Sequence, residues 1–325
     1  MSRRLRGEDE GPLTVRHQSV AAEPSGEEVL ALPAVRSRGL TLVARLATRH
    51  GGVFRLADAE ADYVLKAMDG TAAREDSAWP YWRAKSIHDE TTAMRALNDL
   101  IGGHFVDGGR HGRVTWLLQR WVTGASASTL ARRHRDAGAL SPLIELYAAQ
   151  ARMLAAIHEA GWLHCDLQPA HFVHRQDGAA CLIDLGFARR VDDDSSSFRG
   201  QLLHYAAPEF IRSSLQRDRR VPTDVRMEIY SFGAVMFEMH SGKTATDYGN
   251  VDPALVPKIV KMRRVLEGRR NCLPTFGGRA GDINDLIERC LQPDPARRPA
   301  SMREVASTLE AILTRRRAAS RRLDG

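Results

Sequence analysis

Cysteine is scarce in this sequence, and its few copies are unpaired. The chain of 325 residues holds four of them, Cys165, Cys181, Cys272 and Cys290. No two have the C-x-x-C spacing of a zinc cage or a redox pair. A disulfide framework is equally unsupported, because such frameworks belong to small secreted chains that are dense in cysteine. We therefore expect free thiols in a reducing compartment.

Long apolar runs are lacking as well. The longest ones fall well short of the roughly 20 residues that a membrane-spanning helix requires, so no membrane span is expected. Residues 1–8 are basic, but acidic and polar residues follow them where a secretory signal would have an apolar segment. Hydrophobic residues make up 43% of the chain and charged residues 27%, which is ordinary for a soluble globular protein. A cytoplasmic location is the expectation that follows.

The positive charge of the chain does not indicate a nucleic-acid site. The formal net charge is +7, and a basic surface attracts phosphates or acidic partners. Much of this charge, however, lies in arginines of the C-terminal stretch, residues 315–325, where a solvated basic tail is the simpler interpretation. We predict no nucleic-acid partner.

The residue pattern divides the chain into a short arm, a β-rich part and a helical part. Residues 1–38 are rich in charge, glycine, proline and alanine without sustained periodicity, which predicts a mobile or loosely docked arm. Residues 39–122 alternate short β-prone runs with one helical stretch. The β-prone runs are 40–44, 52–56, 62–66 and 113–118, and the helical stretch is 83–100. An antiparallel sheet is indicated for this part.

Helical signals dominate residues 123–314. Ser141, followed by proline, supplies a predicted N-cap ahead of a long apolar stripe. Another helix is expected over 226–240, and Ser301 with Glu304 forms a capping-box pattern before a last helix. The pattern supports an α+β organisation, with a small β-rich half followed by a larger helical half.

Two short segments of the helical half each place an aspartate after apolar residues. Residues 164–171 read HCDLQPAH, and residues 182–186 read LIDLG. A lone aspartate in such a loop commonly caps neighbouring backbone amides. Together the two segments resemble the catalytic loop and the metal-binding D-F-G element of protein kinases. By that resemblance, which extends from about residue 40 to 315, Asp166 is the catalytic carboxylate and Asp184 the metal ligand.

Later motifs favour the protein-kinase branch of this resemblance. Residues 205–209 (YAAPE) look like the family's A-P-E element, and residues 293–299 (PDPARRP) look like its late arginine segment. In the family these segments supply a partly buried ion pair, here Glu209 with Arg298. Glu228 stands where the family usually has an aspartate that anchors the catalytic loop. Small-molecule kinases of the aminoglycoside type generally lack these elements.

The resemblance implies a bilobal protein-kinase-like fold of the α+β class. Its small antiparallel β-rich N-lobe would comprise residues 39–122, and its larger, mainly helical C-lobe residues 123–314. Phosphoryl transfer in such a fold depends on positioning and charge neutralisation rather than on covalent help from the protein. The implied cofactors are ATP and a divalent metal, Mg²⁺ or Mn²⁺, and the implied partner is a protein or peptide substrate.

Four residues are expected to act in catalysis by this resemblance. Lys66 ends a predicted strand, as the family's phosphate-binding lysine does, and Glu90 falls where its helical partner is expected. The glutamate would fix the ammonium towards the α- and β-phosphates. Asp166 would orient the attacking hydroxyl, and Gln168 replaces the loop lysine that steadies the γ-phosphate.

The adenine is expected to lie between valines of the two lobes, with backbone groups bonding its edge. The residues assigned to nucleotide binding are Gly51, Val53, Val64, Lys66, Arg120, Trp121, Val122 and Val173. Only Gly51 matches a glycine of the family's glycine-rich loop, so fewer backbone amides can approach the phosphates closely. Weaker nucleotide binding is the hypothesis that follows.

The metal site departs from the family pattern. His171 occupies the position of the asparagine that holds a second metal ion. Imidazole is a softer ligand than an amide oxygen and suits magnesium poorly. Three outcomes stay open: His171 binds manganese beside the metal ligand Asp184, it only hydrogen-bonds the catalytic loop, or it marks a kinase that has lost phosphoryl transfer.

Two more departures bear on the acceptor and on control. Gln168 and Gln201 replace the loop lysine and the threonine of the G-T element, which predicts an altered acceptor, a lost one, or a neutral exchange. Cys165 stands where kinases regulated by loop phosphorylation have arginine, so the cationic cradle for a phosphate is missing. We therefore expect no control by phosphorylation of the serines at 195–197.

Three functions are compatible with these residues. The first is ATP-dependent transfer of the γ-phosphate to a Ser or Thr hydroxyl of a protein or peptide. The second is a catalytically impaired pseudokinase that docks and regulates a partner enzyme. The third is a dedicated biosynthetic kinase that acts on a precursor peptide of the lanthipeptide type. The presence of Lys66, Glu90, Asp166 and Asp184 favours a working kinase.

Overall fold

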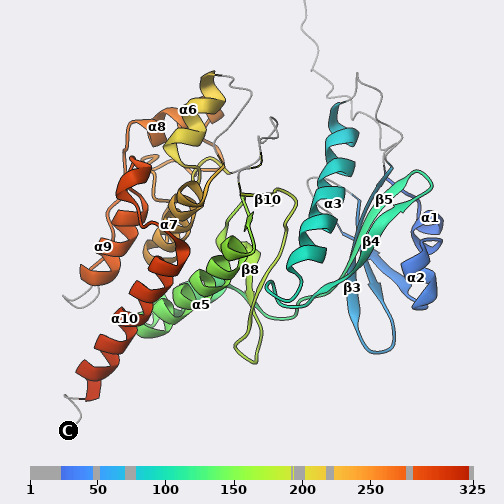
Figure 1. The fold of residues 1–325 in the computed structure, drawn as a ribbon, viewed down its shortest axis with the longest axis horizontal. Coiled ribbons are helices and arrows are strands. Elements are labelled where there is room, and N and C mark those ends of the chain that lie inside the picture. The colour runs from blue at the N-terminus through green and yellow to red at the C-terminus, as the bar shows by residue number, and fades with distance from the viewer. Residues whose placement is uncertain are drawn as a thin grey trace, which may run out of the picture.

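A sheet-rich N-terminal part precedes a mainly helical part in the computed structural model (Figure 1). The residues that the structure describes are 23–46, 52–69, 78–191, 193, 202–216, 223–275 and 281–321. Gly51, Gln201 and the serines at 195–197 lie outside these ranges. The predicted α+β fold, with an antiparallel N-lobe and a helical C-lobe, is confirmed.

Five antiparallel strands form the N-lobe sheet, in the order β1-β2-β3-β5-β4. These strands are β1 (Thr41–Arg45), β2 (Val53–Ala57), β3 (Asp62–Asp69), β4 (Phe105–His111) and β5 (Val114–Arg120). The register pairs Lys66 of β3 with Val53 of β2 on one side and with Leu117 of β5 on the other. Lys66 therefore lies on the central strand of the sheet, with a neighbour on each side to hold its backbone.

Alternation along the strands gives the sheet two different faces. Leu65 of β3 and Trp116 of β5 turn to one face and join a hydrophobic cluster there. Lys66 turns to the opposite face, where its ammonium contacts Glu90 of helix α3 (Ala78–Leu97). One face of the sheet is thus apolar, and the other face carries Lys66, which points towards helix α3.

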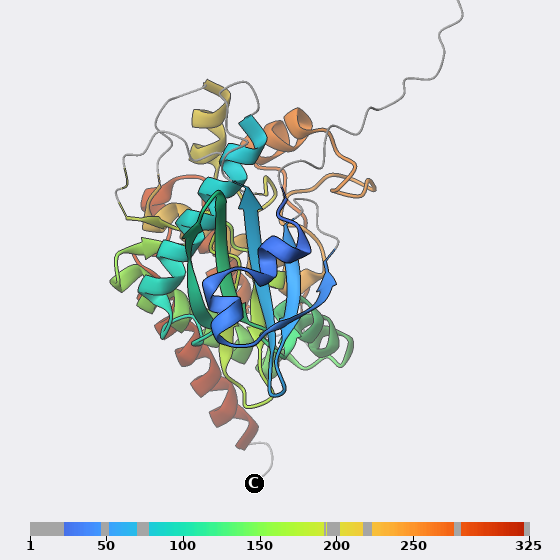
Figure 2. The same cartoon turned by 90° about the vertical axis from the view of Figure 1, so that its right-hand side faces the viewer.

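Two short N-terminal helices cover the apolar face. Helix α1 (Gly26–Leu30) starts with a capping box between Ser25 and Glu28, and α2 (Pro33–Ser37) has proline in its first turn. Their fully buried side chains are Val29, Leu32 and Val35. In Figure 2, α1 and α2 lie in front of the sheet and α3 lies behind it.

The predicted mobile or loosely docked arm, residues 1–38, is corrected only for its described part, because residues 1–22 lie outside the described ranges. From Ser25 onwards the segment is a fixed layer of the N-lobe, and Glu28 accepts a hydrogen bond of 2.7 Å from the Arg113 guanidinium of the turn between β4 and β5. Helices of five residues are too short to show a 3.6-residue period, so the pattern of polar and apolar residues gave no signal. Burial against the sheet, not local propensity, holds them in place.

Helices dominate the C-lobe, and short strands hold its loops. The helices are α4 (Ala127–Asp136), α5 (Leu140–Glu159), η2 (Pro169–His171), α6 (Pro208–Gln216), α7 (Val225–Ser241), α8 (Lys258–Leu266), α9 (Gly281–Cys290), η3 (Pro295–Arg297) and α10 (Met302–Arg321). The strands are β6 (Ala125–Ser126), β7 (Trp162–Leu163), β8 (Phe172–His174), β9 (Ala180–Leu182) and β10 (Arg189–Arg190). They pair as β6-β8-β9 and as β10-β7, on either side of the segments that carry Asp166 and Asp184.

Two helix ends differ from the predicted ones. Helix α5 begins at Leu140 with Ala139 before it, so Ser141 lies inside the first turn and caps nothing. Helix α10 runs to Arg321, so most of the predicted basic tail, 315–325, is helical as far as it is described. None of the helices in the described ranges is both long and apolar enough to cross a membrane.

The cysteines are free, as predicted. Cys165, Cys181 and Cys290 are buried, and Cys272 is exposed. Burial raises the pKa of the Cys165 thiol well above its ordinary value, which keeps it protonated. Because the thiolate is the reactive form, we interpret Cys165 as an inert packing residue.

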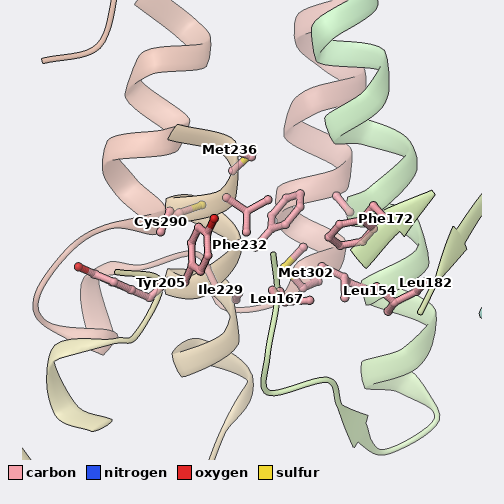
Figure 3. Close-up of a cluster of buried hydrophobic side chains, with 14 of the residues drawn as sticks. Leu154, Leu167, Phe172, Leu182, Tyr205, Ile229, Phe232, Met236, Cys290 and Met302 are labelled. Carbon is pink, nitrogen blue, oxygen red and sulfur yellow. The ribbon is translucent and has the colours of Figure 1, made fainter. Parts of the chain in front are cut away.

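A hydrophobic core lies beneath the catalytic loop. Leu167, which follows Asp166, is fully buried together with Phe172, Phe232 and Met302. Figure 3 shows these side chains converging from the catalytic loop, β8, α7 and α10. The rings of Phe172 and Phe232 meet edge to face with their centroids 6.5 Å apart. Since a close-packed core resists displacement, this contact helps to fix the backbone that follows Asp166.

Candidate active site

One lysine joins three parts of the chain in the cleft between the lobes. The Lys66 Nζ atom lies 2.7 Å and 2.9 Å from the two carboxylate oxygens of Glu90, and 2.9 Å from Oδ1 of Asp184. The three residues come from β3, from α3 and from the loop after β9. The structure therefore brings together the lysine and the two carboxylates that the sequence singled out.

Opposite charges favour the ionised forms of Lys66 and Asp184. Although burial disfavours the ammonium, Glu90 and Asp184 hold the pKa of Lys66 above its ordinary value. Lys66 in turn holds the pKa of Asp184 well below the usual range of a carboxyl. The Glu90 side chain is 1% exposed, whereas that of Asp184 is 48% exposed. Glu90 therefore contacts the lysine in the buried interior, whereas the Asp184 carboxylate remains partly accessible to a ligand.

Two residues of the site have strained backbones. Cys165 and Asp184 both have a φ of 63°, in the left-handed region that glycine favours. Such a conformation costs on the order of 1–3 kcal/mol at a residue with a side chain, and it persists only where the surroundings enforce it. Both positions flank the predicted catalytic and metal-binding groups, which is where strain of this kind is found in functional sites.

Asp166 is held beneath the surface of the cleft. Its residue is 7% exposed, and its carboxylate accepts a hydrogen bond of 3.0 Å from the Gln168 amide. Burial raises the pKa of Asp166 above its ordinary value, against the opposing effects of His171 and His164. The two aspartates of the site thus have opposite pKa shifts, because only Asp184 has an ammonium beside it.

Glu228 of α7 fixes the catalytic loop from below. One carboxylate oxygen accepts the Cys165 N–H at 2.7 Å, and the other accepts the His164 N–H at 3.2 Å. Although burial opposes ionisation, the hydrogen bond from His158 holds the pKa of this fully buried carboxyl below its ordinary value. The longer glutamate thus reaches the loop backbone and makes the anchoring contacts that the resemblance implied.

His158 is part of this anchor, and no sequence pattern predicted its role. Its Nε2 lies 2.6 Å from the Glu228 carboxylate, at the end of helix α5. A carboxylate can only accept, so the imidazole donates. The only available signal was a histidine shortly before the catalytic loop, which alone is indistinguishable from an ordinary helix residue.

His171 lies between the Asp166 backbone and the metal ligand. Its Nδ1 lies 2.9 Å from the Asp166 carbonyl oxygen, which only accepts, so Nδ1 carries a proton. Nε2 lies 3.6 Å from Oδ2 of Asp184. In the neutral ring Nε2 has a lone pair and could share a cation with that oxygen, whereas in the protonated ring it pairs with the carboxylate directly. Of the three outcomes predicted for His171, the hydrogen bond to the catalytic loop is present in the structure. Manganese binding and loss of phosphoryl transfer stay predictions, because they concern activity and not geometry.

The donor set fits one metal ion better than two. Among the described residues no group of three or more histidine, cysteine or carboxylate side chains could enclose a metal ion by itself. Asp184 has a free, half-exposed carboxylate oxygen, the type of hard ligand that suits Mg²⁺ when phosphates supply the rest. An imidazole at the second position suits Mn²⁺ better than Mg²⁺.

The valines predicted to hold the adenine lie on β2, β3 and β8, and two N–H groups of the predicted hinge already have backbone partners. Val53 and Val173 are buried and Val64 is half-buried. The N–H groups of Arg120 and Trp121, however, are already bonded at 2.8 Å to the carbonyls of His104 and Asp62. They are therefore not free donors for an adenine edge. Carbonyl oxygens and the Val122 N–H are the groups left for that purpose.

The late motifs meet as predicted. The Arg298 guanidinium makes two hydrogen bonds, of 2.7 Å and 2.8 Å, to the carboxylate oxygens of Glu209. The Arg298 side chain is fully buried, and its guanidinium also lies 5.0 Å from the ring centre of Tyr230. This pair ties the start of α6 to the segment before α10.

Comparison with known proteins agrees with this geometry. The protein kinase domain family matches residues 51–309, which is well over half of the chain. The chain therefore belongs to the protein kinase family.

Three relatives illustrate the range of similarity. A probable serine/threonine-protein kinase of Clostridium perfringens is 24% identical over 228 residues, which are 69% of this chain and 31% of the relative. Serine/threonine-protein kinase pkn2 of Myxococcus xanthus is 29% identical over 70% of this chain and 27% of its own length. Serine/threonine-protein kinase PknL of Mycobacterium tuberculosis is 26% identical over 80% of this chain and 62% of its own. The chain thus spans only part of the length of each.

Proposed function

We propose that the chain transfers the γ-phosphate of ATP to a Ser or Thr hydroxyl of a protein or peptide. The observation that carries this proposal is the Lys66 ammonium, 2.7 Å from Glu90 and 2.9 Å from Asp184. A buried lysine paired in this way presents a fixed positive charge to the α- and β-phosphates. The family generally uses ATP with Mg²⁺, and Asp184 is the residue that would hold the metal.

The protein's own groups have separate tasks in this reaction. Asp166 accepts the proton of the acceptor hydroxyl as its oxygen attacks the γ-phosphorus, and ADP leaves on the opposite side. Gln168, bonded to the Asp166 carboxylate, orients that carboxylate and offers its second N–H to the transferring phosphoryl group. Glu228 keeps the loop backbone in the required conformation from below.

Phosphate incorporation tests this proposal. The purified chain is incubated with labelled ATP and casein, in Mg²⁺ and separately in Mn²⁺, and phosphoserine and phosphothreonine are measured. We expect activity in the wild type and its loss in Asp184→Asn. Asp177→Asn is the matched control, because this exposed aspartate lies in the β8–β9 turn and bonds only its own turn. Failure of the wild type in both metals, with nucleotide bound, would contradict the proposal.

A pseudokinase that regulates a partner enzyme is the second candidate. It is favoured by the neutral Gln168 and by the histidine at 171, since both replace groups that act on the γ-phosphate or its metal. This reading predicts that ATP or ADP raises the melting temperature while no acceptor is labelled. The same pair of measurements therefore separates the two candidates.

A further inference from the structure

A pocket lies on the hinge; it shares Arg120, Trp121 and Val122 with the residues predicted to bind the nucleotide, and Lys66 is not among its lining residues. It has a volume of about 580 Å³, within the range of small-molecule sites. Its walls come from the turn between β2 and β3, the loop between α3 and β4, the hinge at 120–123, and Arg175 of the β8–β9 turn. Both lobes therefore contribute to it, and none of the steps proposed for phosphoryl transfer uses it.

The walls of this hinge pocket are joined by backbone hydrogen bonds. The hinge bonds to the α3–β4 loop through Arg120 N–H and the His104 carbonyl, and to the β2–β3 turn through Trp121 N–H and the Asp62 carbonyl, each at 2.8 Å. The α3–β4 loop bonds in turn to the C-lobe, where the Leu182 N–H meets the Ile101 carbonyl at 3.1 Å. A pocket with walls fixed in this way needs little reordering to accept a ligand.

Most of the acidic charge in the hinge pocket is already satisfied. Asp58 accepts two backbone N–H groups of its own turn and the Tyr63 hydroxyl, and Asp62 forms a two-pronged ion pair with Arg55. Only Glu60, on the exposed tip of the turn, is left among the acids. The acidic wall is therefore structural and does not call for a cation.

The basic groups are less well matched. Arg120 has no carboxylate within 4.0 Å among the described residues, and Arg175 reaches only Asp177, at that limit. A guanidinium presents several N–H donors in one plane, which suits the oxygens of a carboxylate or phosphate. The pocket therefore has two guanidinium groups without a close ion pair, and a bound anion could accept hydrogen bonds from both.

His104 adds a buried polar group to the inner wall. The residue is 3% exposed, and neither ring nitrogen has a hydrogen-bond partner among the described residues. Burial, with help from Arg175 and Lys66, lowers the pKa of His104 to about 4, so the ring is neutral and carries one N–H. Buried polar groups in proteins are normally satisfied, and an unpartnered one beside a pocket marks a place for a ligand atom.

We propose that the hinge pocket binds a small organic anion, with its carboxylate or phosphate group between the guanidinium groups of Arg120 and Arg175 and a further acceptor near His104. The bound anion would join the hinge to the C-lobe β8–β9 turn. Because the same hinge backbone borders the nucleotide cleft, such a ligand would stabilise the relative placement of the lobes.

Binding of citrate and of inorganic phosphate tests this proposal, with the carboxylate and phosphate arms run separately. Affinity is measured by calorimetry on the whole chain, in the wild type and in Arg175→Gln, His104→Phe and Arg297→Gln. Arg297 is an exposed C-lobe arginine outside the pocket and is the matched control. We expect at least one anion to bind, about tenfold more weakly in Arg175→Gln because a charged hydrogen-bond donor is lost, and unchanged in Arg297→Gln.

A second background separates this pocket from the nucleotide cleft. In Lys66→Met the cleft loses its phosphate-binding ammonium, so anion binding that persists there belongs to the hinge pocket. The proposal is overturned if neither anion binds, if Arg175→Gln and Arg297→Gln bind equally, or if binding vanishes in a Lys66→Met protein that still shows a cooperative melting transition. None of these results depends on whether the chain transfers phosphate.

Discussion

The two sides of the cleft are built on different principles. On one side, the Lys66 ammonium contacts two carboxylates, Glu90 of the N-lobe and Asp184 of the C-lobe, and these three residues form the lysine set. On the catalytic-loop side, the positions around Asp166 carry the neutral Gln168 and His171, and these side chains bond within the loop itself.

The difference shows which positions of such a site tolerate exchange. Removing one member of a buried ion pair leaves an uncompensated charge, which typically costs about 3–5 kcal/mol, so the lysine set is constrained by folding as well as by function. Gln168 and His171 hydrogen-bond within the catalytic loop, and we expect an exchange there to alter the chemistry more than the fold. The departures from the family pattern accordingly spare the lysine set and lie in the catalytic loop and in the glycine-rich loop.

The largest expected effect comes from breaking the lysine set. In Lys66→Met the phosphates lose their fixed cation, and we expect kcat/KM for phosphate transfer to fall by about 10²- to 10³-fold, as for other single electrostatic groups of active sites. Steady-state kinetics with casein measure it. Lys85→Met is the control, because Lys85 forms only an exposed pair with Asp89. A loss of less than tenfold in Lys66→Met would contradict the assigned role.

The next effect concerns the anchor of the loop side. Glu228→Gln replaces a fully buried carboxylate that accepts from the backbone of 164–165 and from His158. Because charge-assisted bonds are exchanged for weaker ones, we expect the free energy of unfolding to fall by about 2–4 kcal/mol. Urea unfolding measures the change.

Two further variants make this measurement specific. Glu228→Asp keeps the charge but shortens the reach, and we expect an intermediate loss. Glu310→Gln removes an exposed pair with Arg152 and should change stability by less than about 1 kcal/mol. Equal stability of Glu228→Gln and Glu310→Gln would show that the anchor does not hold the loop.

Much of this site could be predicted from the sequence, because the residues of each kinase-like motif keep the family's spacing within that motif. Lys66 and Asp184 are 118 residues apart, and no local pattern joins them. The resemblance to the family supplied that long-range contact, and the same holds for Glu209 with Arg298. The role of Glu228 followed from its position at the start of the central helix.

What escaped prediction depends on tertiary burial. Val29, Leu32 and Val35 hold helices α1 and α2 against the sheet. Each helix has only five residues, which is too short to show a helical period of apolar residues in the sequence. The occupied N–H groups of Arg120 and Trp121 escaped for a related reason. Their partners, His104 and Asp62, lie on other elements, and only the folded chain brings them to the hinge.

Acidic pH should weaken the fold through buried histidines outside the lysine set. The pKa values of His104, His204 and His240 are lowered by burial to about 4, from an ordinary value of 6.5. The unfolded chain takes up these protons below pH 6.5, whereas the folded chain does not until about pH 4. Stability from these groups is thus complete above pH 6.5 and is lost as the pH falls towards 4.

We expect each of these histidines to contribute a loss of about 1–2 kcal/mol between pH 7.5 and pH 5. His104→Phe should remove the contribution of one histidine to the acid-induced loss of stability. The unfolding free energy of this variant should therefore depend less on pH than that of the wild type. Urea unfolding of both proteins at the two pH values gives the comparison. An identical loss in both would mean that His104 titrates alike in the folded and unfolded chains.

The smallest effect, in His171→Asn, makes the loop side resemble the family and so tests the comparison directly. An amide oxygen is a harder ligand than the imidazole Nε2 that now lies 3.6 Å from Asp184. We expect activity with Mg²⁺ to rise several-fold, about 1 kcal/mol in transition-state terms, and the ratio of Mn²⁺ to Mg²⁺ activity to fall. His111→Asn, at an exposed end of β4, should leave that ratio unchanged. If His171→Asn leaves it unchanged too, the histidine is only a hydrogen-bonding member of the loop, and the two sides of the cleft differ in packing and not in how they hold the metal.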